Sequence, residues 1–186
     1  MVQNIETLPP PAPVRTSSLG HEILFMDTAV RQSSMLATGV RAGVEVILLP
    51  TQQDGVEQIT QVLRKRRGLT CMHIVAPGGT SSLQLGTTVL SLNTLERYVW
   101  DLTVWSNALT ANAELLIYTS DLARGVRGEE FVGHLSELIG VKVAASRSKT
   151  GNSLLGGNWN LELQTLPCQT LPVFTSETLA AYDALL

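Results

Sequence analysis

Short apolar runs separated by helix-length amphipathic segments constrain the fold of this chain more than any other feature of its sequence. Near-continuous apolar runs are typical of strands that are covered on both faces, and strands that alternate with helices form parallel sheets. Five such runs follow one another, and we expect each to be a strand: 22–27, 44–49, 71–75, 114–118 and 141–145. The pattern predicts an α/β fold with a mainly parallel central sheet flanked by helices.

The segments between these runs predict the helices and one hairpin. Asp54 is a suitable N-cap for a helix that ends before Gly68, and the basic run 64–67 lies in its last turn. These cations complement the dipole at the helix C-terminus, although an anion or nucleic-acid patch is the alternative interpretation. We also expect helices at 93–109 (with Ser91 as an alternative cap), 128–139 and 176–186, a hairpin at 82–90 and a short strand at 159–163.

Length and charge restrict the class of protein. The 186 residues, 44% of them hydrophobic, suffice for one substantial core, so we expect a single domain over residues 21–186. A net charge of −3 and a pI of about 5.6 provide no overall basic field for nonspecific nucleic-acid binding. No run reaches the roughly 18 to 20 apolar residues of a membrane span, and the N-terminus lacks the pattern of a cleaved signal, which favours a cytoplasmic location.

Residues 1–20 differ in composition from the rest of the chain. They contain Pro9, Pro10, Pro11 and Pro13, and proline supplies no N–H group for helix or sheet hydrogen bonds. We therefore expect a proline-rich, extended arm outside the domain. Extended segments of this kind dock readily on other proteins, so these four prolines are the candidate partner-binding residues and other protein subunits are the expected partners.

Two cysteines, Cys71 and Cys168, are too few for a disulfide framework and form no metal cluster by their spacing. Cys71 opens an apolar run and is expected to be free and buried. His73 lies in the same run and is expected to make a hydrogen bond within the core. The sequence thus predicts neither a cofactor nor a metal ion.

Polar loops follow the third and fourth apolar runs, where the ligand sites of parallel sheets lie. The candidate cleft residues are Gly78 and Gly79 after the third run and Thr119 and Asp121 after the fourth. The glycine pair predicts a tight turn. An anion-binding nest, and with it a small-ligand sensor, is the weaker alternative, because the glycine spacing and the lysine of a phosphate-binding loop are missing.

Seven motifs, in order along residues 23–163, point to a known family. They lie at 54–59, 73–78, 82–86, 115–121, 144–146, 150–152 and 155–162, and include His-Ile-Val-Ala-Pro-Gly and Leu-Gly-Gly-Asn-Trp-Asn-Leu-Glu. With these motifs the chain resembles a bacterial domain family of unknown function. That family is typically found near the N-terminal end of very large, secreted, repeat-rich, adhesin-like proteins, notably in cyanobacteria and proteobacteria.

This family is similar to the caspase and gingipain cysteine peptidases, so the resemblance implies a three-layer, caspase-like fold. In those enzymes a histidine follows one strand and a cysteine follows the next, and imidazole and thiol form the catalytic dyad. Family members usually carry His-Ile-Val-Ser-His-Gly and Tyr-Gly-Cys-Asn. In this chain the positions that match the dyad are Pro77 and Ser120, 43 residues apart. Proline has no titratable group, and a serine hydroxyl needs a base to become a nucleophile.

The resemblance therefore implies a catalytically inactive, peptidase-like domain, which acts as a protein-binding, scaffold or assembly module. The alternative is a hydrolase that uses Ser120 with a base from elsewhere. His73 lies about 13 Å from Pro77 along a strand, too far to replace that base. We expect Val75 and Tyr118 to end neighbouring strands, which brings Pro77 and Ser120 together, and Ser120 to be only a minor hydrogen-bonding group.

Overall fold

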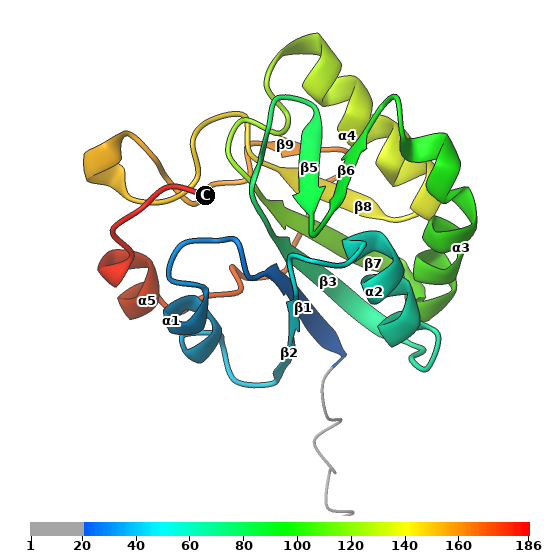
Figure 1. Ribbon diagram of the computed structural model, residues 1–186, viewed down its shortest axis with the longest axis horizontal. Coiled ribbons are helices and arrows are strands. Elements are labelled where there is room, and N and C mark those ends of the chain that lie inside the picture. The colour runs from blue at the N-terminus through cyan, green and yellow to red at the C-terminus, as the bar shows by residue number, and fades with distance from the viewer. Residues whose placement is uncertain (1–20) are drawn as a thin grey trace, which may run out of the picture.

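A six-stranded sheet forms the centre of residues 21–186, the part of the chain that the computed structural model describes (Figure 1). Its strand order is β2-β1-β3-β7-β8-β9, and the first five strands are parallel. The strands are β1 (Glu22–Asp27), β2 (Val44–Leu49), β3 (Leu69–Val75), β7 (Leu109–Tyr118), β8 (Lys142–Ala145) and β9 (Leu163–Gln164). β9 is antiparallel to β8. The predicted arm, with Pro9, Pro10, Pro11 and Pro13, lies outside the described residues.

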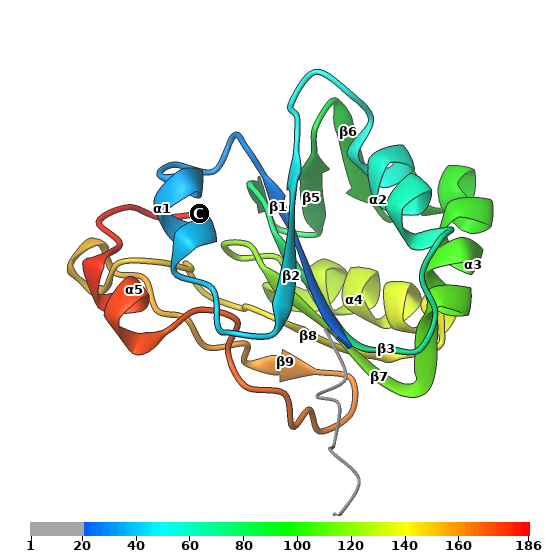
Figure 2. The ribbon, with the colours of Figure 1, turned by 90° about the horizontal axis from the view of Figure 1, so that it is seen from below.

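Helices flank both faces of this sheet, which confirms the predicted three-layer α/β architecture (Figure 2). The sheet divides the apolar core into two clusters, because successive strand side chains point to opposite faces. Phe25 of β1 packs in one cluster with Trp105. Its neighbour Leu24 packs in the other cluster with Leu36 and Tyr182. The helices of the first cluster are α2 (Gly55–Leu63), α3 (Val99–Ala108) and α4 (Gly125–Ile139), and those of the second are α1 (Ser33–Thr38) and α5 (Ser176–Ala181).

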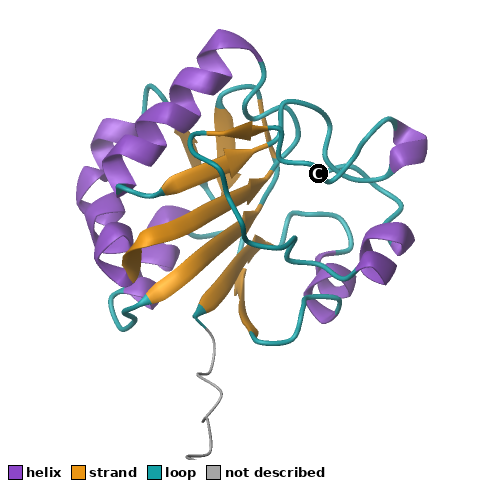
Figure 3. Cartoon of the chain, turned by 180° about the vertical axis from the view of Figure 1, so that it is seen from behind, coloured by secondary structure: helices purple, strands orange, loops and turns teal. Residues whose placement is uncertain are grey.

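A small antiparallel sheet follows β3 at its carboxyl end. It consists of β4 (Gly78–Gly79), β5 (Ser82–Leu85) and β6 (Thr88–Ser91). The predicted hairpin at 82–90 is therefore confirmed as β5 and β6. Figure 3 shows the main sheet with its strands side by side and the loops gathered beyond their ends.

The ends of α2 follow local capping chemistry. Asp54 accepts the N–H of Glu57 at 3.0 Å, as an N-cap does. At the other end, Arg66 donates from Nη1 to the carbonyl of Val62 at 2.8 Å. The basic run was predicted in the last turn, but α2 ends at Leu63 with Arg64 as its C-cap, so the run follows the helix. Arg66 nevertheless reaches back to a carbonyl at the end of the helix, as the dipole interpretation expects.

Several element boundaries differ from the predicted ones. β7 begins at residue 109 instead of 114, α4 begins at residue 125 instead of 128, and a 3₁₀ turn, η1 (Leu95–Tyr98), replaces the first part of the helix predicted from residue 93. The helix α1 was not predicted from the sequence. This helix has six residues and no side-chain cap hydrogen bond, so it lacks the signal that marked α2.

The C-terminal part of the chain contains less regular structure than predicted. The strand expected at 159–163 is reduced to β9, because the N–H of Asn160 turns back to Asn158 Oδ1 at 2.7 Å instead of joining a ladder. A 3₁₀ turn, η2 (Ser153–Leu155), precedes this segment. α5 is capped by Thr175 and ends at Ala181, five residues before the predicted end.

Candidate functional site

The carboxyl edge of β3 and β7 carries Pro77 and Ser120, the two positions at which the resemblance leads us to expect a peptidase dyad. Val75 and Tyr118 are direct register partners, as predicted. Beyond them, the N–H of Ala76 donates to the carbonyl of Tyr118 at 3.3 Å. Pro77 and Ser120 therefore follow neighbouring strands at the same edge of the sheet.

The hydroxyl of Ser120 forms two hydrogen bonds to the main chain. Oγ donates to the carbonyl of Leu186 at 2.5 Å and accepts the N–H of Thr150 at 3.0 Å. Both partners are main-chain groups of segments that are distant from Ser120 in the sequence. The expectation that Ser120 is a minor hydrogen-bonding group is therefore wrong: its hydroxyl joins three segments that are distant in the sequence.

An extended C-terminal segment runs beside Ser120. Leu185 forms an antiparallel bridge with Gly151. The N–H of Leu186 donates to the carbonyl of Thr150 at 2.9 Å. These backbone bonds place the main-chain oxygen of Leu186 where the hydroxyl of Ser120 reaches it.

The tight turn predicted at the glycine pair lies one step later, at residues 80–81, and the two glycines form the strand β4 that leads into it. Gly78 pairs with Leu83 and Gly79 pairs with Ser82. A Cβ atom on Gly78 would lie 2.4 Å from the carbonyl oxygen of Ser82 and 2.6 Å from Cγ2 of Thr119, whereas a Cβ on Gly79 would meet nothing closer than 4.0 Å. Gly78 is therefore a glycine because β5 and β7 approach it closely.

The side chains of the two remaining cleft candidates are engaged in contacts at this edge of the sheet. Thr119 is buried, and its Oγ1 donates to the carbonyl of Ala76 at 2.8 Å. Asp121 adopts a left-handed conformation with φ of 59°. Its carboxylate lies 3.6 Å from the guanidinium of Arg124. Within residues 21–186, neither side chain forms a hydrogen bond to Ser120.

The three histidines lie in other environments. His73 is buried in the core, and His21 Nδ1 lies 2.9 Å from the carbonyl of Gly68. His134 lies on α4 and lines a groove with Arg127. Within residues 21–186, no histidine forms a hydrogen bond to Ser120.

Comparison with known proteins assigns the chain to a family. Residues 23–186 match the family model of the domain of unknown function DUF4347. The chain belongs to this family. No curated protein matches it. Among the described helices of this DUF4347 domain, none is both long enough and apolar enough to cross a membrane.

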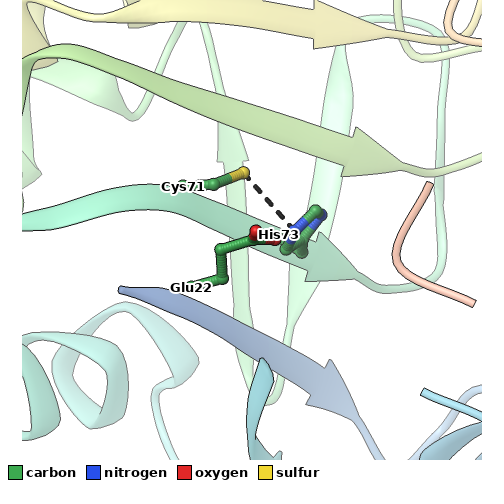
Figure 4. A group of neighbouring side chains, drawn as sticks. All are labelled: Glu22, Cys71 and His73. Atoms are coloured by element: carbon green, nitrogen blue, oxygen red, sulfur yellow. Dashed lines mark hydrogen bonds and ion pairs between the residues drawn. The ribbon is translucent and has the colours of Figure 1, made fainter. Parts of the chain in front are cut away.

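A buried polar cluster of this DUF4347 domain lies near the starts of β1 and β3 (Figure 4). His73 Nε2 lies 3.2 Å from Glu22 Oε2 and 3.4 Å from Cys71 Sγ. Arg41 donates from Nη2 to Glu22 Oε2 at 2.7 Å. Cys71 is free and buried and His73 is hydrogen-bonded in the core, so both predictions are confirmed.

Burial and hydrogen bonding set the charges of this cluster. The hydrogen bond with His73 lowers the pKa of Glu22, against the effect of partial burial, and Arg41 lowers it further. Burial raises the pKa of the Cys71 thiol and lowers the pKa of His73. At neutral pH the isolated cluster therefore holds a carboxylate, a thiol and a neutral imidazole.

A segment that we name the strap, residues 169–173, covers the same face of the DUF4347 sheet. The carboxylate of Glu114 accepts the N–H groups of Gln169 at 2.9 Å and of Thr170 at 2.8 Å. Arg41 donates from Nε to the carbonyl of Pro172 at 2.7 Å. One carboxylate and one guanidinium thus hold the strap over the strands that carry the cluster.

Neither the cluster nor the strap was predicted from the sequence, and the reasons differ. Glu22, Cys71 and His73 occupy alternate positions on two strands that were both predicted, so the register of β1 and β3 would have revealed the cluster. The bonds from Glu114 to Gln169 have no such signal, because they join residues 55 positions apart through the backbone of an irregular segment.

Proposed function

We propose that the chain is a catalytically inactive, peptidase-like domain that acts as a protein-binding, scaffold or assembly module. The observation that carries the proposal is the state of Pro77 and Ser120 at one edge of the sheet. Proline offers no base, and the hydroxyl of Ser120 is bonded to two backbone groups. A serine nucleophile requires a general base within hydrogen-bond reach, and within residues 21–186 no side chain forms a hydrogen bond to the hydroxyl of Ser120.

The relationship to caspase- and gingipain-type peptidases is part of the same proposal. So is an origin among the large, secreted, adhesin-like proteins of cyanobacteria and related bacteria. The expected partners are other protein subunits. The net charge of −3 supports a protein partner over a nucleic acid.

Labelling with a serine-reactive fluorophosphonate tests the loss of catalysis. We expect the full chain to react no faster than its Ser120→Ala variant, because the hydroxyl has no base to ionise it. Labelling of the wild type that disappears in Ser120→Ala would instead support the alternative hydrolase, with its base supplied by another chain.

A restored dyad tests the relationship to the cysteine peptidases. In the double variant Pro77→His and Ser120→Cys, the imidazole should lower the pKa of the new thiol and speed its alkylation. The matched control is Ser120→Cys alone, which has the thiol without the imidazole. Equal alkylation rates in the two variants would argue against the assignment of Pro77 and Ser120 as the dyad positions.

A further inference from the structure

The cluster of Glu22, Cys71 and His73 has the composition of a metal site. Glu22 on β1 is the direct register partner of Cys71 on β3, and His73 lies two residues further along β3. Side chains alternate between the two faces of a strand, so all three project from one face of the sheet. Figure 4 shows one oxygen, one sulfur and one nitrogen meeting there.

The two donor separations that involve His73 lie close to those that a small cation requires. His73 Nε2 lies 3.4 Å from Cys71 Sγ and 3.2 Å from Glu22 Oε2, and all three donor atoms lie within 4.8 Å of one another. Zinc bonds of about 2.0 to 2.3 Å in a tetrahedral arrangement place neighbouring donors about 3.3 to 3.8 Å apart. His73 is therefore already placed to share an ion with either neighbour, and binding of one ion by all three residues requires Cys71 Sγ and Glu22 Oε2 to lie at a similar separation.

Hydrogen bonds alone do not explain why these three donor atoms lie so close together. A neutral imidazole nitrogen carries either one hydrogen or one lone pair, so His73 Nε2 makes a well-directed bond to only one of its two neighbours. The other ring nitrogen, Nδ1, is buried without a partner. A cation, in contrast, takes a lone pair from each of the three donors at once.

The surrounding charges suit a divalent ion. Arg41 binds Glu22 Oε2 at 2.7 Å, which orients the carboxylate and leaves a second lone pair on that oxygen. Glu114, the register partner of Cys71 on β7, adds a buried carboxylate. Glu114 is paired with Lys142 at 3.4 Å, and with Cys71 as a thiolate the two negative charges of Glu22 and Cys71 match the charge of a divalent ion.

We infer that Glu22, Cys71 and His73 bind one zinc ion through Oε2, Sγ and Nε2. Thiolate, imidazole and carboxylate are the ligands that zinc takes in proteins, and water occupies the fourth position. On binding, a Zn–S bond replaces the S–H bond of Cys71 and the proton passes to solvent. This site is separate from the edge with Pro77 and Ser120, and it clamps β1 to β3 beneath the strap.

Cobalt absorption spectroscopy on the full chain tests this site. Protein freed of metal by dialysis against a chelator is titrated with Co²⁺, which substitutes for zinc and reports a thiolate ligand by a charge-transfer band. We expect the band to saturate at one ion per chain and to disappear when Zn²⁺ displaces Co²⁺. Zinc should also raise the Tm, because it binds the folded state.

Two variants and a matched control assign the ligands. Cys71→Ser should abolish the charge-transfer band and weaken zinc binding about tenfold or more, and Glu22→Gln should weaken binding while keeping the band. Cys168→Ser removes the other free cysteine and should change neither property. The wild-type spectrum decides the question even when a variant does not fold. A wild type without the band at saturating Co²⁺, or a band that is lost in Cys168→Ser, overturns the zinc site.

Discussion

At the scale of single residues, polar side chains near the carboxyl edge act as connections between distant backbone segments. Ser120 joins the end of β7 to Thr150 and Leu186. Glu162 does the same for the loop after β8, since its carboxylate accepts Ser148 Oγ at 2.5 Å and the N–H of Arg147 at 2.8 Å. These groups stabilise the loops around Pro77 and Ser120, and we expect their removal to lower the free energy of unfolding.

Ser120→Ala should lower the free energy of unfolding by about 1 to 2 kcal/mol, because two partly buried hydrogen bonds are lost and their backbone partners stay unpaired. Urea unfolding measures the change. The control is Ser34→Ala, which removes the hydroxyl of an exposed serine in α1 and should have little effect. Equal stability of the two variants would show that the bonds of Ser120 contribute nothing.

The stabilisation by Glu162 should depend on pH. Partial burial raises the pKa of this carboxyl, but the hydrogen bonds from Ser148 and Arg147 outweigh burial and hold the pKa below the ordinary value of 4.5. A carboxyl with a lowered folded-state pKa stabilises the fold above its unfolded pKa and loses that effect as the pH falls through the folded value.

We therefore expect Glu162→Gln to be less stable than the wild type at neutral pH, and the difference to shrink once the pH falls below about 4.5. Urea unfolding at a series of pH values measures it. Glu137→Gln, on the exposed side of α4, serves as the control. A difference that is independent of pH would contradict the role of the ionised carboxylate.

At the scale of elements, the hairpin β4-β5 is packed directly against the end of β7. Its two glycines are adjacent but have different surroundings. A Cβ atom on Gly78 would collide with Ser82 and Thr119, whereas a Cβ atom on Gly79 would have room. The pair therefore separates the effect of close packing from the general effect of a glycine substitution.

Gly78→Ala should destabilise the domain by about 1 to 3 kcal/mol, since an added methyl group in a tightly packed position forces the backbone apart. Gly79→Ala should change stability far less, because its Cβ has room. Thermal unfolding of both variants compares them under the same conditions. Equal losses in Tm would contradict the close approach at Gly78.

Most elements of the central sheet were predictable from local pattern. The runs that became β1 and β2 matched in both boundaries, because continuous apolar stretches mark strands covered on two faces. The helix α1 and the irregular C-terminal part were not predictable in this way. Six residues give too few turns for a helical period, and the two-residue strand β9 is too short to alternate.

At the scale of the whole molecule, a row of polar groups crosses four neighbouring strands. The register aligns Glu22 of β1 with Cys71 of β3, Cys71 with Glu114 of β7, and Glu114 with Lys142 of β8. Glu114 also binds the strap. This row connects the first strand of the domain to its C-terminal segment. A substitution at Glu114 should therefore destabilise residues that are distant from it in the sequence.

Glu114→Gln should lower the free energy of unfolding by about 1.5 to 3 kcal/mol, because the charge-assisted bonds to the strap are lost. The strap should also become more sensitive to protease near the exposed Leu171. Limited proteolysis with mass spectrometry locates the cleavage. The exposed Glu130→Gln on α4 is the control, and a strap equally protected in both variants would contradict this role of Glu114.

The sequence by itself determined the class of the fold and the main strands and helices. These depend on residue types and on periods of a few residues, which are local properties of the chain. Only the tertiary structure decided that Ser120 binds Leu186, 66 positions away, and that Glu22 meets His73, 51 positions away. Such contacts require donor and acceptor atoms within about 3 Å, and this depends on the path of the whole chain through the fold.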